Sequence, residues 1–265
     1  MIWASDIHLD HAPPYSRKGF YKEILDTGTK SLLITGDIAM GNSLTKYLLE
    51  LLEGLPEITI YFVLGNHDYY LSSIEKVRRT VVDLCDQHPR LRYLSATPPV
   101  LLSEDTYLVG MDGWADAQYG DTVRTTVWLN DFEYIEDLKG YSPLGSRKEL
   151  HTKLKGLGLH EAQRLRKYLE MVPESAKRVV VATHVPPYET AACHRGKISE
   201  PDFLPYFSCK ATGETIDKFS VSRPETKIDV FCGHTHGHSV YEKGNITVYT
   251  GKAQYGYPEI QIEEI

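Results

Sequence analysis

The sequence has few cysteines and no long hydrophobic run. Its four cysteines show no Cys-x-x-Cys spacing among the 265 residues, which disfavours a disulfide framework or a cysteine zinc site. The longest apolar run, residues 58–64, is much shorter than the ~18 residues that a membrane span needs. A secretory leader is not expected, because Asp6 and His8 interrupt the first apolar stretch. We therefore predict a cytoplasmic protein without membrane contact, and we interpret the cysteines as buried thiols (Cys85, Cys193, Cys209, Cys232).

Positive charge is scarce relative to negative charge. The chain has 29 Lys and Arg residues against 36 Asp and Glu residues, so its formal charge is −7. Proteins that bind nucleic acid by neutralising phosphates carry basic patches or runs, and this sequence has no such run. Nucleic acid is therefore not an expected partner. With 42% hydrophobic and 25% charged residues, the composition is that of a folded protein, long enough for one large α/β domain or two small ones.

Short apolar runs alternate with helical patterns in the N-terminal part of the chain. Residues 74–84 have apolar side chains at three-to-four spacing after Ser72 and Glu75, a candidate capping box, and residues 44–52 and 159–171 are similar. This alternation predicts a layered sheet with helices on its faces. The predicted buried strands are 2–5, 32–35, 58–64, 107–109, 179–183 and 228–232, and the predicted antiparallel strands of the tail are 239–242, 246–250 and 259–263.

Two segments show neither helical nor strand periodicity. Residues 112–145 contain six of the aromatic side chains, and residues 186–225 contain several prolines. Long irregular segments within compact folds are often functional. We therefore interpret both as insertions that form a possible substrate lid.

Five short polar clusters each follow directly on an apolar run. They are Asp-Ile-His at 6–8, Gly-Asp at 36–37, Gly-Asn-His-Asp at 65–68, His184, and Gly-His-Thr-His at 233–236. Ligands bind outside the carboxyl ends of the strands in open α/β sheets, so these clusters are expected to converge. In an extended segment, residues two apart project from one side. Each of the two i, i+2 pairs, Asp6 with His8 and His234 with His236, could therefore bind one ion.

The ordered set of clusters resembles the five blocks of the calcineurin-like metallophosphoesterase superfamily, over residues 6–236. The resemblance implies one α/β domain over residues 1–265, with the four-layer α/β/β/α sandwich of that superfamily. It also implies two divalent metal ions, with Asp37 bridging them. By this resemblance Asp6, His8 and His236 bind one ion, and Asn66, His184 and His234 bind the other.

The donor set favours Mn, Fe, Zn or Co over Ca, and Mn is the ion we expect to support activity in assays. The resemblance then implies a hydrolase in which a metal-bridging hydroxide attacks phosphorus. His67 would donate the proton to the leaving oxygen. Asp68 is expected to support a neighbouring ligand or the loop itself.

Two departures point away from the Ser/Thr protein phosphatases of this superfamily. Those enzymes carry Gly-Asp-x-x-Asp-Arg-Gly, whereas Met40 and Gly41 occupy the positions of the second Asp and the Arg here. Their third block ends in Glu, whereas this one ends in Asp68. An acid that pairs with the proton donor is therefore missing at Met40.

We predict hydrolysis of small phosphoesters, with a nucleotide-type phosphodiester or monoester as the preferred class because an aromatic lid suits a planar group. Two alternatives remain open, a metal-dependent nuclease and a non-catalytic metal-binding scaffold. Candidate phosphate-binding cations are Arg17, Arg124 and Arg195.

Overall fold

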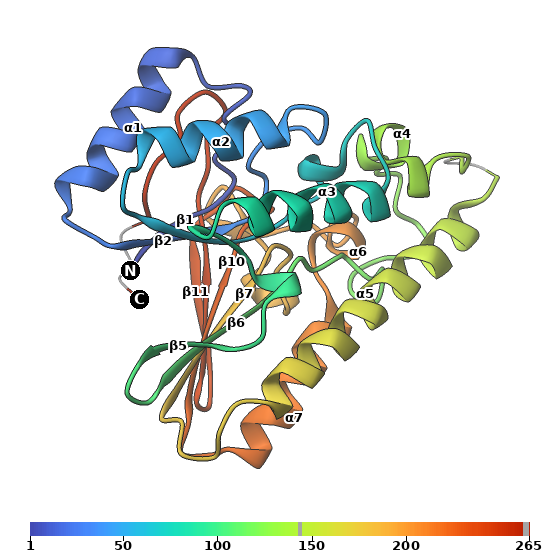
Figure 1. Ribbon diagram of the computed structural model, residues 1–265. Coiled ribbons are helices and arrows are strands. Elements are labelled where there is room, and N and C mark those ends of the chain that lie inside the picture. Colours follow the sequence, from blue (N-terminus) through green and yellow to red (C-terminus); the bar gives the residue numbers. More distant parts are fainter. Residues whose placement is uncertain (143–144, 262–264) are drawn as a thin grey trace.

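Two β-sheets lie at the centre of the structure (Figure 1). This computed structural model describes residues 1–142, 145–261 and 265. The first sheet is parallel throughout, in the order β1 (Ile2–Ala4), β2 (Ser31–Thr35), β3 (Thr59–Val63) and β4 (Leu91–Tyr93). The second sheet is mixed, in the order β11 (Ser239–Lys243), β12 (Ile246–Thr250), β10 (Lys227–Cys232), β7 (Arg178–Thr183), β6 (Thr106–Met111) and β5 (Val100–Ser103). Only its outer strands β5 and β11 pair in antiparallel fashion.

Alternate residues of each buried strand face opposite layers, as the period of a strand requires. Trp3 of β1 and Phe231 of β10 pack together between the sheets, whereas Ile2 and Ala4 belong to the core under the helices. The first sheet is covered by α1 (Pro14–Asp26), α2 (Leu44–Gly54) and α3 (Ile74–Gln87), and the second by α5 (Arg147–Glu170) and α7 (Lys210–Ser222). The predicted four-layer α/β/β/α sandwich is confirmed.

The helix boundaries differ from the sequence prediction in places. The predicted apolar face of α3 is buried, but Ser73 rather than Ser72 caps the helix, by accepting a hydrogen bond from the Lys76 amide. Helix α5 begins at Arg147, well before the predicted residue 159. In the tail, β11 and β12 form the predicted antiparallel pair. Residues 259–261 are not a strand, and the rest of the strand predicted at 259–263 lies outside the described residues.

The two supposed insertions contain regular structure. Segment 112–145 includes α4 (Asp131–Tyr134) and the short helix η3 (Glu136–Leu138). Segment 186–225 includes η4 (Glu189–Ala191), the hairpin of β8 (Cys193–His194) and β9 (Lys197–Ile198), α6 (Leu204–Phe207) and the whole of α7. The interpretation of these segments as irregular was wrong. The sequence of α7 shows little apolar periodicity because its buried face is built largely from small and polar residues (Ala211, Thr212, Gly213, Ile216).

A buried carboxylate, Asp112, joins the two halves of the sandwich below the strand ends. It accepts hydrogen bonds from the Leu64 amide and from the hydroxyl groups of Tyr93 and Ser95, and its backbone carbonyl accepts one from the His184 amide at 2.9 Å. Burial alone would raise the pKa of Asp112, but Arg78 and these hydroxyl groups hold it below its usual value. Asp112 therefore fixes the end of β3 relative to the end of β7.

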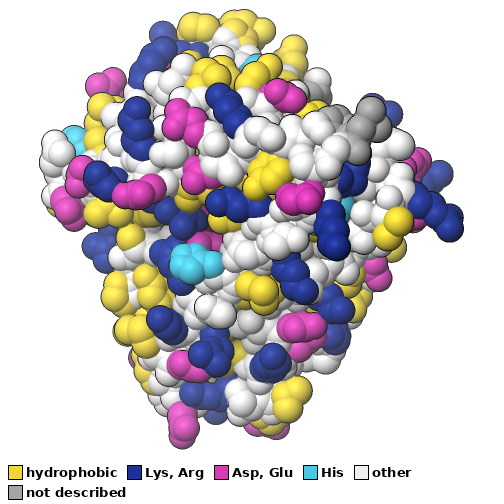
Figure 2. Space-filling view, turned by 90° about the vertical axis from the view of Figure 1, so that its right-hand side faces the viewer, with side chains coloured by type: hydrophobic (Ala, Val, Ile, Leu, Met, Phe, Trp, Pro, Cys, Tyr) yellow, Lys and Arg dark blue, Asp and Glu magenta, His cyan; other side chains and the backbone are white. Residues whose placement is uncertain are grey.

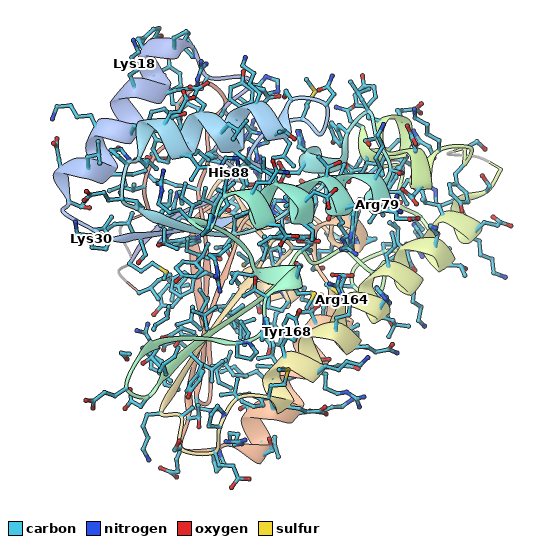
Figure 3. All side chains as sticks on the ribbon, viewed as in Figure 1. Lys18, Lys30, Arg79, His88, Arg164 and Tyr168 are labelled. Carbon is cyan, nitrogen blue, oxygen red and sulfur yellow. The ribbon has the colours of Figure 1, made fainter. Side chains whose placement is uncertain are left out.

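Helix α5 is tied to the short helix η2 (Leu94–Ala96) that follows β4. Arg164 and Tyr168 extend from α5 toward this segment (Figure 3), and both donate hydrogen bonds to the Ser95 carbonyl. All four cysteines are free; Cys209 and Cys232 are buried as predicted, whereas Cys85 and Cys193 are only half-buried. In the described ranges, none of the helices has both the length and the apolar character needed to cross a bilayer.

Candidate metal centre

The five polar clusters all follow strands at their carboxyl ends. Asp6 and His8 come after β1, Asp37 after β2, and Asn66 after β3. In the second sheet His184 follows β7, whereas His234 and His236 follow β10. Because both sheets run these strands in parallel and the sheets pack face to face, the clusters meet at one edge of the sandwich.

The backbone at most of the candidate ligands is left-handed rather than extended. Five of the candidate ligands have positive φ, between 37° and 71° (Asp6, His8, Asp37, His234, His236). Such a conformation costs about 1–3 kcal/mol in a non-glycine residue and is concentrated at functional sites. The prediction that each i, i+2 pair projects from one extended segment is therefore wrong. As a result, His234 and His236 turn toward different groups of side chains.

The first group contains Asp6, His8, Asp37 and His236. One ligand atom from each lies within 4.8 Å of the others. His8 Nε2 is 3.2 Å from His236 Nε2, and His236 Nε2 is 3.5 Å from Asp6 Oδ1. His8 Nδ1 is buried and has no hydrogen-bond partner in the part of the chain that the structure describes. Two carboxylates and two imidazole nitrogens thus face one another at this point.

The charge states in this group depend on burial and on the neighbouring side chains. Burial alone would raise the pKa of Asp6, but His236 and the other nearby histidines hold it well below its usual value. Burial lowers the pKa of His8 well below its usual value, and the neighbouring His67 lowers it further. The group therefore presents a carboxylate beside a neutral imidazole, both of which are suitable ligands for a divalent cation.

The second group contains Asn66, His184 and His234. Asn66 Oδ1 lies 2.9 Å from His184 Nε2 and 2.9 Å from His234 Nδ1. Asn66 Nδ2 donates a hydrogen bond to Asp131 Oδ1 at 2.8 Å, so the amide oxygen must face the two rings.

Both histidines of this group use their other ring nitrogen to donate to a backbone carbonyl. His184 Nδ1 lies 2.9 Å from the Thr35 oxygen, and His234 Nε2 lies 2.9 Å from the Tyr206 oxygen. A carbonyl only accepts, so this network assigns the ring proton to those nitrogens and leaves a lone pair on the nitrogen that faces Asn66. Burial lowers the pKa of His184, and lowers that of His234 to about 4, which keeps both rings neutral. Three acceptors that converge without a donor fit a divalent cation.

Asp37 lies between the two groups. Its Oδ1 is 3.5 Å from His184 Nε2, whereas its Oδ2 is 3.8 Å from His8 Nε2. Burial raises the pKa of Asp37 well above its usual value, and the nearby Asp6 carboxylate raises it further. A cation bound beside Asp37 would lower the pKa of this carboxyl group and so oppose both effects. Gly65 is required here, because a Cβ at this position would lie 2.2 Å from Asp37 Oδ1.

Asp68 connects the loops that carry Asp37 and Asn66. Its Oδ1 accepts hydrogen bonds from the amides of Ile38 and Ala39, both at 2.9 Å, and its Oδ2 accepts one from the Gly65 amide at 2.8 Å. Burial raises the pKa of Asp68 to about 8, although these three amides oppose the shift. The Asp68 carboxylate therefore links the two loops through their backbone amides.

His67 lies beside both groups without belonging to either. Its amide donates to Asp37 Oδ1 at 2.9 Å, and its Nε2 is 3.9 Å from Asp37 Oδ2. Its ring stacks on Tyr70, with ring centroids 4.3 Å apart. Burial and nearby histidines, His234 first among them, lower its pKa to about 3. His67 is neutral in the absence of a bound anion.

A cavity of about 640 Å³ opens over these side chains. Of the three arginines predicted from the sequence, Arg195 lines it and the other two do not. Arg17 instead forms an ion pair with Glu50 at 2.6 Å, and the side chain of Arg124 is 87% exposed and lies 3.9 Å from Asp121. Arg17 and Arg124 therefore do not reach the cavity.

Several residues of the cavity wall were missed by the sequence analysis, and three of them contact candidate site residues (Asp131, Tyr70, Tyr255). Asp131 and Tyr70 are linked by a hydrogen bond of 2.6 Å from the Tyr70 hydroxyl group to Asp131 Oδ1. Tyr255, in the loop after β12, packs its ring against His8 at 4.4 Å and against His236 at 5.2 Å. None follows a strand directly, and no local motif distinguishes them. Only the aromatic content of segment 112–145 drew attention to the region of Asp131.

We expect an Asp131→Ala variant to bind Mn²⁺ about 10- to 100-fold more weakly, because the Asn66 amide loses the partner that fixes its orientation. Calorimetric titration of the metal-free protein measures this affinity. A Glu133→Ala variant is the control, since it removes an exposed carboxylate of the same helix α4, whose hydrogen bond is with Trp128 and not with Asn66. Equal affinity of Asp131→Ala and the wild type would show that Asn66 is oriented by other contacts.

Comparisons with known proteins identify the family to which this chain belongs. The sequence matches the family model for calcineurin-like phosphoesterases over residues 2–238. The structure is similar to a phosphopantetheinyl hydrolase from Mycobacterium tuberculosis, with 13% identity and a TM-score of 0.66, over 99% of this chain and 95% of that chain. It is also similar to a dimetal phosphatase from Danio rerio, with 12% identity and a TM-score of 0.58, over 94% of this chain and 85% of that chain.

A third solved structure, TT1561 of Thermus thermophilus, has 15% identity and a TM-score of 0.51, over 95% of this chain and 88% of that chain. At these identities the likeness is one of fold. No curated protein sequence matches the chain significantly. The family match covers all five clusters and most of both sheets. The chain belongs to the calcineurin-like phosphoesterase family and is a metal-dependent phosphoester hydrolase that uses divalent cations.

Proposed function

We propose that the protein hydrolyses small phosphoesters at a centre of two divalent ions, with nucleotide-type monoesters or diesters as substrates. The observation that carries this proposal is the position of Asp37, whose two oxygens face different groups of ligand atoms. Asp6, His8 and His236 would hold one ion with Asp37 Oδ2, and Asn66, His184 and His234 would hold the other with Asp37 Oδ1. The mixed donor set favours Mn, Fe, Zn or Co.

When bound, two such ions neutralise the phosphate charge and supply a hydroxide nucleophile near neutral pH. The chain's own residues then position the ester and handle the proton. His67 lies on the cavity side of Asp37 and would donate a proton to the leaving oxygen. A phosphate anion beside its ring favours the protonated imidazole, which opposes the lowering of its pKa by burial. Asp68 would keep the loops of Asp37 and Asn66 in register.

The cavity wall supports a substrate with a planar or apolar part. Both segments contribute to it, with residues between Leu129 and Asp131 from 112–145 and several residues between His194 and Phe207 from 186–225, which is the basis for proposing them as a substrate lid. Aromatic rings line the opening from several elements (Tyr70, Phe203, Phe207, Tyr255). Such rings suit a nucleobase or a similar planar group.

The surface charge favours a small substrate over a nucleic acid. On the face shown in Figure 2, Lys and Arg side chains are interspersed with Asp and Glu side chains. No continuous basic stripe of the kind that tracks a phosphate backbone is visible there. Together with the net charge of −7, this mixed face supports small phosphoesters over the nuclease class.

The test is a substrate panel assayed with purified protein and Mn²⁺, Fe²⁺, Zn²⁺ or Co²⁺ in turn. The panel contains p-nitrophenyl phosphate, bis-p-nitrophenyl phosphate, nucleoside monophosphates, cyclic nucleotides and single-stranded DNA. We expect hydrolysis of small esters with Mn²⁺, loss of that activity with a chelator, and no cleavage of the DNA. Preferential cleavage of DNA, or metal binding without hydrolysis of any ester, would contradict the proposal.

A further inference from the structure

The hairpin of β8 and β9 forms one side of the cavity. His194, Arg195, Lys197 and Ile198 all line this cavity. Arg195 and Gly196 have φ values of 50° and 76°, which are typical of a tight two-residue hairpin turn. The turn places two exposed cationic side chains, Arg195 and Lys197, on the wall of the cavity.

The hairpin is held firmly against the loop that carries His234 and His236. His194 Nδ1 donates a hydrogen bond to the Thr235 carbonyl at 2.9 Å. The backbone of the hairpin also lies directly against Gly237, where a Cβ would be 2.3 Å from the Cys193 oxygen. The distance between the hairpin and the metal centre is therefore set by the fold.

Arg195 and Lys197 differ from the other cations considered for phosphate binding. Arg17 and Arg124 have carboxylate partners, whereas the side chains of Arg195 and Lys197 form no ion pair or hydrogen bond within residues 1–142, 145–261 and 265. Glu200 lines the same cavity, and it too lacks an ion pair with either of them in the described ranges. The hairpin thus presents to the cavity two positive charges that have no carboxylate partner in the described ranges.

We propose that this hairpin is a subsite for a second phosphate, so that the preferred substrates are phosphoesters that carry another phosphate beyond the one hydrolysed. The inference rests on the proposed function, because it assumes that the first phosphate lies at the metal centre. Phe203 and Phe207 line the same cavity, where they would contact the body of the substrate. Guanidinium and ammonium groups are the side chains that recognise phosphate oxygens.

The test compares two ligands that differ by one phosphate, adenosine 5′-monophosphate and adenosine 3′,5′-bisphosphate. With Mn²⁺-loaded protein we expect a lower KM and a lower Kd for the bisphosphate. The double variant Arg195→Gln/Lys197→Gln should raise both values for the bisphosphate by about 10- to 100-fold, and change those for the monophosphate by less than about threefold. The turnover number should change little, because the hairpin does not contact the reacting atoms.

Two further variants separate specific binding from bulk charge. Lys155→Gln removes one positive charge from the exposed surface of α5, outside the cavity, and should leave the KM for both nucleotides unchanged. Glu200→Gln removes the opposing carboxylate and should lower the KM for the bisphosphate.

The outcomes also separate this inference from the proposed function. Equal affinity of the wild type for the two nucleotides, with p-nitrophenyl phosphate still hydrolysed, overturns the subsite and leaves the hydrolase intact. If no ester is hydrolysed, the proposed function fails, and calorimetric Kd values for the two nucleotides still decide whether the hairpin binds the second phosphate. A double variant that weakens both nucleotides equally also overturns the subsite.

Discussion

An Asp37→Ala variant is expected to lose hydrolysis of bis-p-nitrophenyl phosphate in the presence of Mn²⁺, by about 10⁴-fold or more. The two oxygens of Asp37 face both groups of ligand atoms. Without this side chain, two cations would lie close together with Asp6 as the only carboxylate in either proposed ligand set. The variant should therefore bind fewer than two equivalents of Mn²⁺, as measured by metal analysis after gel filtration.

The control for this prediction is Asp26→Ala, which removes an exposed carboxylate at the end of α1. It should keep the activity and metal content of the wild type. His236→Ala tests the first group alone, because His236 contacts Asp6 and His8 but not Asn66. Wild-type activity in Asp37→Ala would refute the shared-carboxylate mechanism.

The convergence of the candidate ligands could be predicted because each follows a strand whose pattern is local. The core strands β1, β2, β3, β7 and β10 are short apolar runs, and parallel strands bring their carboxyl ends to one edge. Asn66 thus lies next to His184, and Asp6 next to His236, although each pair is far apart in the sequence. The four-layer order followed from the family resemblance, since periodicity alone indicated only a sheet with helices on its faces.

The cavity wall could not be predicted, because its contacts join segments that have no shared pattern. Asp131 reaches Asn66 across 65 positions of the sequence, and its helix α4 is a single short turn. The left-handed backbone at Asp6 and His234 could not be predicted either. Glycine is the usual sequence signal for positive φ, and neither position is a glycine, so this conformation depends on the packing of the loops. Arg195 was found for its charge alone, and only the fold distinguishes it from Arg17.

A His67→Ala variant is expected to keep both metal ions and to hydrolyse nucleoside monophosphates about 10²- to 10⁴-fold more slowly. The imidazole belongs to neither group of ligand atoms, and the amide that donates to Asp37 Oδ1 remains after the substitution. What disappears is the proton for the leaving oxygen. The loss should therefore appear in the turnover number, with metal content unchanged.

The dependence on the leaving group decides whether His67 donates this proton or only orients its neighbours. p-Nitrophenolate is stable without a proton, so hydrolysis of p-nitrophenyl phosphate by His67→Ala should fall by only about tenfold or less, whereas an alkoxide leaving group requires protonation. His88→Ala, at the C-terminal end of α3 (Figure 3) and not among the residues that line the cavity, is the matched control and should not affect either substrate. An equal loss with both leaving groups would exclude proton donation and would assign His67 a positioning role beside Asp37.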